Sequence, residues 1–328
     1  MVAHNKLPVL DRISDQMRAV LTKSAELAPD AYATDAGLDE QRQAYVTERR
    51  YWNEGGPAMA RTIDAEVPTP HGPVAIRCHL PHEGTALPVI VYVHGGGWVV
   101  GNLDTHDRIM RMLACESGAA VVGVDYALSP EAKFPVALEQ CAAVARHLHE
   151  HGDQYGLDGG RVAFAGDSGG ATMCLATTLL LRDQADAGAP AVGVSALALY
   201  YGMYGLRDSP SRRLLGGPWD GLTDADIDYY LDCYLADPAD ARSPYVDCLG
   251  ADLSRGIPPT YLVAAEFDPL RDDTATLAAI LSGHGVTCSH EVFPGVLHAF
   301  LHNSRMLDAA AVALAHGGAF LAGALDKE

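Results

Sequence analysis

Basic residues are scarce in this chain of 328 residues: Lys and Arg number 23 against 42 Asp and Glu, and the formal net charge is −19. Nucleic acids and anionic membranes are bound by clustered Lys and Arg, and the sequence contains no basic block. We therefore expect no nucleic-acid partner and no membrane partner. The acidic surplus is more typical of solubility than of a cationic substrate.

Long uninterrupted apolar runs are also missing. The N-terminus lacks the apolar core of a signal peptide, and the most apolar stretch, 88–100, is interrupted by His94 and three glycines. No segment is therefore expected to span a membrane. The seven cysteines form an odd set without C-x-x-C spacing, which indicates reduced thiols. We expect a cytoplasmic protein.

The pattern of apolar residues predicts an α/β fold. Two helices are expected first, one around 10–21 with Leu10, Ile13 and Met17 on a common face, and one at 39–51. Strands alternating with helices of ten or more residues then predict a mainly parallel sheet with helices on both faces. The expected strands are 62–67, 74–80, 89–93, 119–125, 161–165, 194–199, 260–265 and 286–293, and the expected helices are 136–151, 171–182, 273–282 and a segment after Arg305.

One segment does not fit this alternation. Between the strands ending at Leu199 and starting at Thr260 lie roughly 60 residues, too many for a connecting loop in a compact domain. We interpret 200–256 as one crossover helix plus an inserted lid, paired with the N-terminal helices over the carboxyl edge of the sheet. The prediction is a single domain, 1–328, with cap segments at about 1–55 and 200–256.

The sequence Gly166-Asp167-Ser168-Gly169-Gly170 matches two unrelated serine hydrolase motifs. As G-x-S-x-G it is the nucleophile elbow of an α/β-hydrolase, which requires a strand before the serine and a helix after it. The flanking segments 161–165 and 171–182 satisfy both requirements. A chymotrypsin-like protease would need an all-β chain with its histidine and aspartate before the serine. Chain order therefore favours the elbow, with Ser168 as nucleophile.

A second glycine-rich segment, His94-Gly95-Gly96-Gly97-Trp98, follows the strand at 89–93. In an α/β-hydrolase this is the place of the oxyanion loop. We expect the backbone N–H groups of Gly95, Gly96 and Gly97, together with the N–H of Gly169, to stabilise the oxyanion. The alternative is a flexible glycine turn without a catalytic role.

The base and the orienting acid must follow the serine in the order acid, then histidine. His298 follows a strand and the turn predicted at Pro294-Gly295, which leaves it on a loop that can reach the sheet edge; His290 falls in the strand, His302 one helical turn further on, and His284 at a helix end. We therefore predict His298 as the base.

Asp268 stands just after the strand at 260–265, with Pro269 keeping it out of a helix. It is the predicted acid. Glu266 is the main competitor, whereas Asp272 and Asp273 begin the next helix and are better explained as N-terminal caps.

The motifs together resemble the hormone-sensitive-lipase-like family of α/β-hydrolases. The resemblance rests on HGGGW at 94–98, DYALSPEAKFPVALE at 125–139, GDSGG at 166–170, FDPLRDD at 267–273 and GVLHAF at 295–300. More narrowly, NKLPVLDRIS at 5–14, GNLDTHDRIMRMLA at 101–114, YGLRDSPSRRLLGGPWDGLT at 204–223 and HAFLHNSRM at 298–306 resemble the bacterial acetyl esterases of that family.

This resemblance implies a serine carboxylesterase that acts on acetyl and other short acyl esters and needs no cofactor or metal. It implies Ser168, Asp268 and His298 as the catalytic triad and places His94, Gly95 and Gly96 in the oxyanion motif, in agreement with the residue-based prediction. It also leaves open a homodimer and contacts with regulatory proteins of sugar metabolism. Two departures stand out, since the family usually has Ala at Gly169 and often Phe at Trp98.

Other patterns have more ordinary explanations. Glu131 is expected to brace the loop beneath the site rather than act on substrate. His147, His149 and His151 suggest metal ligation, but a solvated helix end explains them better. The aromatic residues Tyr200, Tyr201, Tyr204 and Trp219 fit cap packing and a pocket wall equally well.

The sequence thus predicts a short-chain carboxylesterase. Two alternatives remain: an amidase or peptidase on the same fold, and a regulatory binding protein that has kept the fold. Relative rates on matched ester and amide substrates would distinguish an esterase from an amidase or peptidase. Covalent labelling of Ser168 would distinguish an enzyme from a binding protein.

Overall fold

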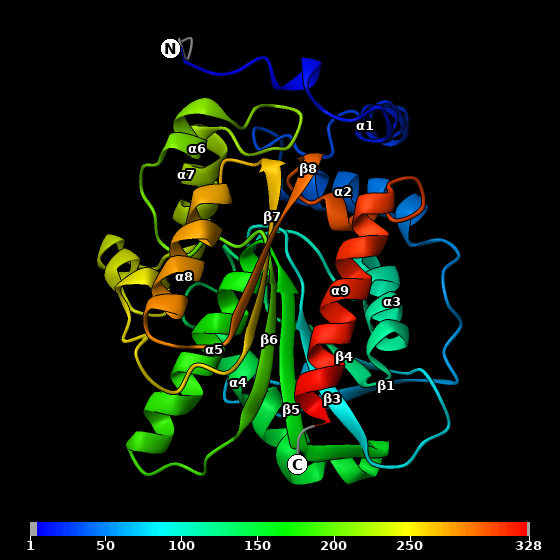
Figure 1. The fold of residues 1–328 in the computed structure, drawn as a ribbon, viewed down its shortest axis with the longest axis vertical. Helices are drawn as coiled ribbons and strands as arrows, with labels where there is room; N and C mark the ends of the chain where they lie inside the picture. Colours follow the sequence, from blue (N-terminus) through cyan, green and yellow to red (C-terminus); the bar gives the residue numbers. More distant parts are fainter. Residues whose placement is uncertain (1–4, 327–328) are drawn as a thin grey trace.

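The computed structural model describes residues 5–326, which form an eight-stranded sheet in the order β1-β2-β4-β3-β5-β6-β7-β8 (Figure 1). Pairing is antiparallel for β1 with β2 and for β2 with β4, and parallel for all other neighbours, so the predicted mainly parallel sheet is confirmed. The strands are β1 (Arg61–Val67), β2 (Val74–Leu80), β3 (Leu87–Val93), β4 (Ala120–Asp125), β5 (Leu157–Asp167), β6 (Val194–Tyr200), β7 (Thr260–Phe267) and β8 (Cys288–Leu297).

Helices cover both faces of the sheet. Figure 1 shows α4 (Val136–His151), α5 (Gly169–Asp186) and α8 (Arg271–Gly283) on one side, and α3 (Asp107–Ser117) and α9 (Asp308–Leu325) on the other. The sequence patterns above do not predict α3. Its signal is the buried apolar spacing of Ile109, Met110 and Leu113 inside a segment that is otherwise charged.

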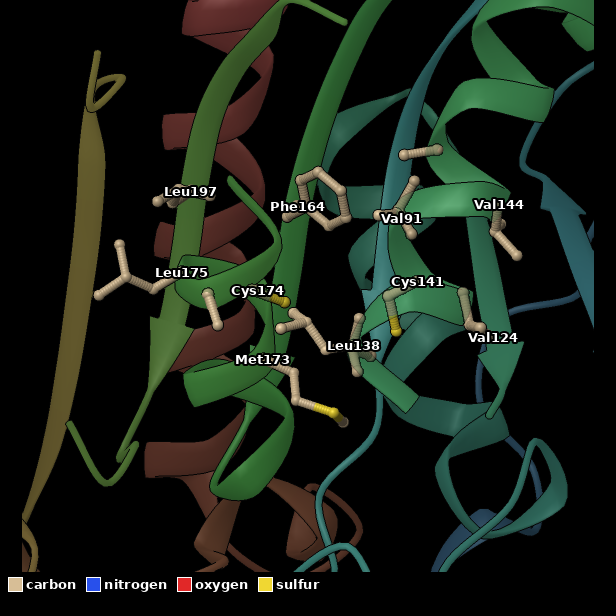
Figure 2. Close-up of a cluster of buried hydrophobic side chains, with 14 of the residues drawn as sticks. Val91, Val124, Leu138, Cys141, Val144, Phe164, Met173, Cys174, Leu175 and Leu197 are labelled. Carbon is tan, nitrogen blue, oxygen red and sulfur yellow. The ribbon is translucent and has the colours of Figure 1, made fainter. Parts of the chain in front are cut away.

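Alternate residues of the strands enter two separate hydrophobic cores, as the period of two along a strand requires. Val91 of β3, Phe164 of β5 and Leu197 of β6 point toward α4 and α5 (Figure 2). Ile90 of β3 and Ala163 of β5 face the opposite core, which contains α3 and α9. A sheet buried on both faces explains why its central strands are almost continuously apolar.

Within residues 5–326, α9 is the one helix that is long and apolar enough to cross a membrane on length and composition. Helix α9 packs along α3 and the sheet, with Ala310, Leu314 and Leu321 fully buried in the second core. Its apolar face is thus occupied by the protein interior, as in a core helix.

The N-terminal helices lie over the carboxyl ends of the parallel strands, at the top of Figure 1. Helix α1 (Asp15–Leu27) begins after Ser14, whose hydroxyl accepts a hydrogen bond from the N–H of Met17 at 3.1 Å. Leu10 precedes this cap in a short 3-10 turn and is exposed, so the predicted helix at 10–21 is wrong at its start. The second prediction is confirmed by α2 (Leu38–Asn53).

The segment between β6 and β7 contributes to the same end of the sheet (Figure 1). It contains α6 (Pro210–Leu214), α7 (Asp224–Tyr234) and two 3-10 turns, Pro238–Arg242 and Cys248–Gly250. The division into a core and a two-part cap stays a prediction, and residues 1–4 of the first cap segment lie outside the described residues.

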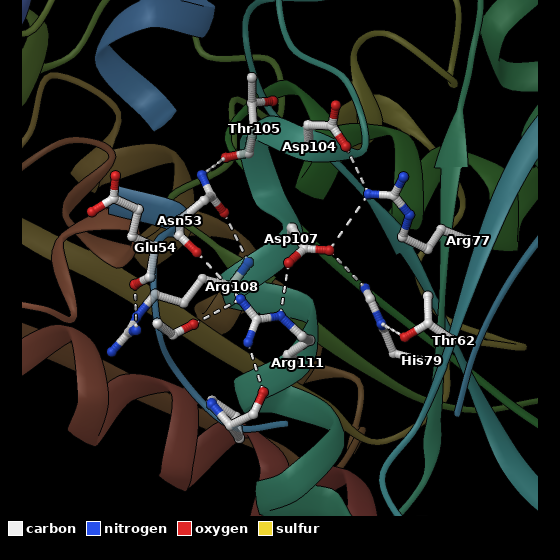
Figure 3. Close-up of polar contacts among 12 residues, drawn as sticks. Asn53, Glu54, Thr62, Arg77, His79, Asp104, Thr105, Asp107, Arg108 and Arg111 are labelled. Atoms are coloured by element: carbon white, nitrogen blue, oxygen red, sulfur yellow. Dashed lines mark hydrogen bonds and ion pairs between the residues drawn. The ribbon is translucent and has the colours of Figure 1, made fainter. Parts of the chain in front are cut away.

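A polar network joins the N-terminal segment to α3 and β2 (Figure 3). Asp107 accepts a hydrogen bond from Arg111 at 2.7 Å and lies 3.1 Å from the Nε2 atom of His79. Asn53, the last residue of α2, accepts a hydrogen bond from the N–H of Arg108 at 2.8 Å. The start of α3 is therefore fixed from two sides, which positions the loop that precedes it.

Strand β8 contains a deviation from the sequence prediction. Pro294-Gly295 does not end the strand, because β8 continues to Leu297 with a shift of register opposite Ala265 and Phe267 of β7. Since β8 is an edge strand, the missing N–H of the proline leaves no ladder partner unpaired. The continued strand delivers His298 directly from its carboxyl end.

Candidate active site

Ser168 lies between the end of β5 and the start of α5, as the elbow motif predicts. Its backbone has φ 52° and ψ −124°, and its N–H donates to the carbonyl of Tyr200 at 2.8 Å. A Cβ atom on Gly170 would collide with the backbone oxygen of Val93. The motif therefore has glycine at this position because the first turn of α5 passes directly against the end of β3.

The three predicted triad residues lie in one hydrogen-bonded chain. The Nε2 atom of His298 is 2.9 Å from the Oγ atom of Ser168, and its Nδ1 atom is 2.7 Å from Oδ2 of Asp268. Asp268 is fully buried, and its other oxygen accepts the N–H of Leu270 at 2.7 Å. This geometry allows proton transfer from the serine hydroxyl to an imidazole whose orientation is fixed by a carboxylate.

The electrostatic surroundings of His298 favour its protonated form. Burial by itself lowers the pKa of the imidazole, but the charge of Asp268 and its hydrogen bond to Nδ1 outweigh burial, so the pKa of His298 is raised. The ring also packs edge-on against Tyr201, with 4.8 Å between centroids. An imidazole held in this way can carry a proton without leaving its position.

The other downstream histidines lie elsewhere. His290 is within β8, and His284 follows the last turn of α8. His302 lies in the 3-10 turn Phe300–Asn303, where it is buried beside Asp167.

The other acidic candidates also have structural partners. Glu266 accepts the N–H of Gly295 at 2.8 Å and so holds the irregular part of β8. Asp272 accepts the N–H of Ser211 at 2.8 Å. One oxygen of Asp273 accepts three backbone N–H groups, those of Tyr204, Gly205 and Leu206, at 2.8 to 3.1 Å.

The glycine loop differs in part from its prediction. The N–H of Gly95 donates to Oδ1 of Asp167 at 3.0 Å, so Gly95 is not a free oxyanion donor. Gly96 and Gly97 line the cavity beside Ser168, and across residues 5–326 no protein acceptor receives their N–H groups. The His94 ring stacks on Tyr126 with centroids 4.2 Å apart, at the base of the loop. Of the N–H groups predicted to stabilise the oxyanion, those of Gly96, Gly97 and Gly169 remain.

Asp167 connects the elbow to this loop, a role that the sequence analysis does not assign. Besides the Gly95 N–H, it accepts the hydroxyl of Tyr92 at 2.8 Å and faces His106 and His302. Burial alone would raise the pKa of Asp167, but its charge interaction with His106 and the other donors hold it well below the usual range. The carboxylate therefore stays charged and fixes the loop against the elbow.

His106, Asp167 and His302 are also the one group of three within residues 5–326 whose spacing could hold a metal ion, with ligand atoms within 4.8 Å of one another. All three are buried, and two hydrogen bonds already point at the carboxylate. The His147 and His151 rings contact each other, but the described chain brings no third ligand to them.

Two cavities meet at Ser168. One, about 30 Å³, is enclosed mostly by apolar side chains and does not touch His298; it is lined by Gly97, Trp98, Ser168, Gly169, Met203, Leu222, Ile227, Tyr230 and Leu270. The other, about 60 Å³, is bordered by His298 and by polar groups that include Arg49, Asp167 and Asp220.

Trp98 and Gly169, the two departures from the family pattern, lie against each other. A Cβ atom on Gly169 would be 3.2 Å from the Trp98 ring, closer than most real contacts of a Cβ atom. The ring itself is fixed by stacking on Tyr234, with centroids 4.3 Å apart. An alanine at 169 would therefore require the Trp98 ring to move by a few tenths of an ångström.

The remaining predictions are resolved by contacts. Glu131 receives two hydrogen bonds from Arg42 at 2.7 and 2.8 Å, and the same guanidinium donates to the carbonyl of Val99, so Glu131 braces the loop as predicted. Tyr200 and Tyr204 are fully buried core residues, whereas Trp219 borders a cavity near His298.

Comparison with known proteins identifies relatives along nearly the whole chain. The α/β-hydrolase fold family matches residues 90–302. The acetyl esterases of Salmonella dublin and Salmonella enteritidis PT4 are each 46% identical over 320 residues, which cover 98% of this chain and 97% of each relative.

Solved structures give the same result. An esterase of the archaeon Pyrobaculum calidifontis superposes with a TM-score of 0.87 at 33% identity, covering 95% of this chain and 98% of that one. A thermostable esterase of Pseudomonas putida ECU1011 superposes with a TM-score of 0.86 at 27% identity, covering 97% and 99%. Each of these relatives is named for ester hydrolysis.

Proposed function

Because this chain belongs to the α/β-hydrolase fold family and is a carboxylesterase, we propose that it cleaves acetyl and other short-chain acyl esters with Ser168 as nucleophile, His298 as base and Asp268 as orienting acid. The observation that carries this proposal is the continuous chain of hydrogen bonds from Ser168 Oγ through both nitrogens of His298 to Asp268. Every catalytic role in it is filled by a protein group or by water.

The first half of the reaction forms an acyl-enzyme. Ser168 Oγ attacks the ester carbonyl carbon while His298 Nε2 takes the hydroxyl proton, and Asp268 stabilises the resulting imidazolium. The carbonyl oxygen becomes an oxyanion that accepts hydrogen bonds from the N–H groups of Gly96, Gly97 and Gly169. Each such donor is worth about 2.7 to 4 kcal/mol of transition-state stabilisation.

The second half releases the acid. When the tetrahedral intermediate collapses, the C–O bond to the alcohol breaks and His298 gives its proton to the leaving oxygen. A water molecule then transfers a proton to His298 and attacks the acyl carbon, and Ser168 leaves with that proton. The products are a carboxylic acid and an alcohol.

The two cavities at Ser168 support a short acyl group. Since His298 must reach the leaving oxygen, the alcohol belongs in the cavity that His298 borders. The acyl group then belongs in the other cavity, whose volume is about 30 Å³. Its walls are bulky side chains, among them Trp98, Leu222 and Tyr230. These walls leave little room beside Ser168 and so favour a short acyl group such as acetyl.

Two further features belong to the proposal. The segments 5–55 and 200–256 act as a cap, because Tyr32 and Tyr45 from the first and Leu222 and Tyr230 from the second border the substrate cavity. A cytoplasmic location is supported by seven free cysteines, four of them buried. A homodimer and regulatory protein contacts stay predictions from the resemblance.

The decisive experiment compares wild type and Ser168→Ala on p-nitrophenyl acetate, butyrate and octanoate. We expect the wild type to have its highest kcat/KM on acetate or butyrate, and the variant to lose measurable turnover while keeping its circular dichroism spectrum and melting temperature. Turnover retained by a folded Ser168→Ala protein would refute the triad, and a maximum at octanoate would refute the short acyl site.

A further inference from the structure

Asp220 is a buried carboxyl group beside the triad for which the reaction mechanism has no use. It lies just before α7 and is 8% exposed. Its Oδ1 atom accepts the N–H groups of Gly217 and Leu222 at 3.1 and 3.2 Å, which shapes the loop. Its Oδ2 atom is buried and has no hydrogen-bond partner among the residues that the structure describes.

An unpartnered oxygen on a buried carboxyl group is energetically unfavourable, because it has lost its hydrogen bonds to water. Burial raises the pKa of Asp220 to about 7, because the two backbone donors on the other oxygen and the nearby His298 do not compensate for lost water. Buried polar atoms are normally paired, and Oδ2 is not needed for the loop that Oδ1 holds. The missing partner is therefore expected to come from a bound molecule.

The position of Asp220 shows which part of a substrate it would meet. It borders the alcohol-side cavity together with Ser168 and His298, and it also borders a second cavity of about 190 Å³. Tyr32, Asp220, His298 and Ala299 line both cavities, which therefore adjoin each other. The carboxyl group is thus adjacent to the alcohol part of an ester and distant from the acyl cavity, which it does not line.

We propose that Oδ2 of Asp220 binds a hydroxyl group on the alcohol part of the substrate, so that the preferred substrates are acetyl esters of polyhydroxy alcohols. This inference rests on the function proposed above. It adds the substrate class on the leaving-group side, where the second cavity leaves room for further hydroxylated carbons.

The surrounding groups favour a hydroxyl over a cationic group. Trp219, which borders the 190 Å³ cavity, has a buried indole N–H without an acceptor among the described residues. A hydroxyl group can donate to Asp220 and accept from Trp219, whereas an ammonium group only donates.

The test compares two acetates of equal size, propyl acetate and 2-hydroxyethyl acetate. In the wild type we expect kcat/KM for the hydroxylated ester to exceed that for propyl acetate by about tenfold or more, because a hydrogen bond to a carboxylate discriminates strongly against an analogue without the donor. Asp220→Asn keeps an oxygen for the loop but replaces Oδ2 by an amide donor. In this variant we expect the ratio of the two kcat/KM values to fall close to the ratio of the uncatalysed hydrolysis rates of the two esters.

Two further variants make the result specific. Asp228→Asn removes an exposed carboxylate from α7 and should keep the wild-type ratio. Trp219→Phe keeps an aromatic ring but removes the indole N–H, and should lower the ratio even if Asp220→Asn proves unstable. Acetylcholine serves as the cationic probe, and a preference for it over 2-hydroxyethyl acetate would overturn the hydroxyl assignment.

The outcomes separate this inference from the function beneath it. If the wild type fails to hydrolyse p-nitrophenyl acetate, the esterase proposal itself fails. If it hydrolyses that ester but shows no preference for 2-hydroxyethyl acetate, or if a folded Asp220→Asn protein keeps the preference, only the role of Asp220 is refuted.

Discussion

Backbone strain in single residues is concentrated around the candidate active site. Five non-glycine residues between 5 and 326 have positive φ, and four of them, Trp98, Ser168, Tyr201 and Ala299, surround the substrate cavities or His298. Each such conformation costs on the order of 1–3 kcal/mol and persists only where the surroundings enforce it. The loops that carry the proposed nucleophile, base and oxyanion donors are therefore held in place by the packed sheet beneath them.

The side chain of Asp268 controls both the orientation and the titration of His298. Asp268→Asn removes the charge that raises the pKa of His298, so that burial dominates and this pKa falls. Because the base acts only when neutral, the acidic limb of the pH profile of kcat/KM should move to lower pH. In serine triads this change also lowers kcat by about 10⁴.

The measurement is a pH series of kcat/KM on p-nitrophenyl acetate from pH 5 to 9 for both proteins. Asp272→Asn, which changes a carboxylate in the first turn of α8 that hydrogen-bonds Ser211 and not His298, serves as control. An acidic limb that stays in place in Asp268→Asn would show that another group sets the pKa of His298.

Gly169 and Trp98 should behave as a coupled pair. Gly169→Ala forces a Cβ atom against the Trp98 ring, and overpacking of this kind costs about 1–3 kcal/mol. In a Trp98→Phe background the smaller ring leaves room. Gly169→Ala should therefore lower the free energy of unfolding by less than half as much as it does beside Trp98. Urea unfolding of the four proteins of this double-mutant cycle measures the coupling, and additive effects would contradict it.

Among secondary structure elements, the ends of β7 and β8 show what a sequence pattern can and cannot predict. The run at 260–265 predicts β7, and chain order predicts that an acid follows it. The extent of β8 is not predictable in this way, because Pro294-Gly295 is typical of a turn. Only the edge position of β8 and the contact of Glu266 with Gly295 explain why the strand continues.

Helix α8 holds the segment after β6 through its first turn. Asp273 accepts three N–H groups from residues 204–206. Asp273→Ala should therefore lower the free energy of unfolding by about 3 kcal/mol or more, since the donors lose their acceptor while buried. Asp273→Asn retains an acceptor oxygen and should cost less.

The effect of Asp273→Asn should also depend on pH. Burial raises the pKa of Asp273 to about 6 from 3.8, so its contribution to stability is present below pH 3.8 and is lost as the pH rises through 6. Because asparagine does not titrate, the difference between variant and wild type should shrink from pH 4 to pH 7. Urea unfolding at both pH values tests this, and a difference that grows would contradict it.

Across the whole fold, one hydrophobic core joins the N-terminal segment to the sheet. Ile13, Met17 and Trp52 belong to the same buried cluster as Tyr92 of β3 and Leu314 of α9. The segments proposed as a cap are thus continuous with the sheet, and we expect them to unfold together with it.

The three tryptophans provide the measurement, since Trp52, Trp98 and Trp219 all lie at the active-site end. Fluorescence therefore reports on that end, whereas far-ultraviolet circular dichroism reports on the whole chain. The two urea transitions should coincide within error. A fluorescence transition at lower urea would show that the cap unfolds independently.

Chain order and glycine-rich motifs predict Ser168, Asp268 and His298, which the fold brings into one hydrogen-bonded chain, because these signals are local to the ends of strands. The support of Asp167 for the glycine loop and the position of Asp220 beside Tyr32 and His298 depend instead on how distant segments come together. Such contacts leave no periodic pattern in a sequence, and only the folded chain reveals them.

The packing of Trp98 against Gly169 also restricts how this enzyme could diverge. If alanine arrives at position 169 while tryptophan remains at position 98, the intermediate carries a 3.2 Å contact that the Trp98 ring must relieve. If phenylalanine arrives at position 98 first, neither substitution creates this contact. The pair therefore favours one order for two mutations that would each look conservative alone. For an ancestor with alanine at position 169 and phenylalanine at position 98, shortening the first side chain before enlarging the second avoids the tight contact.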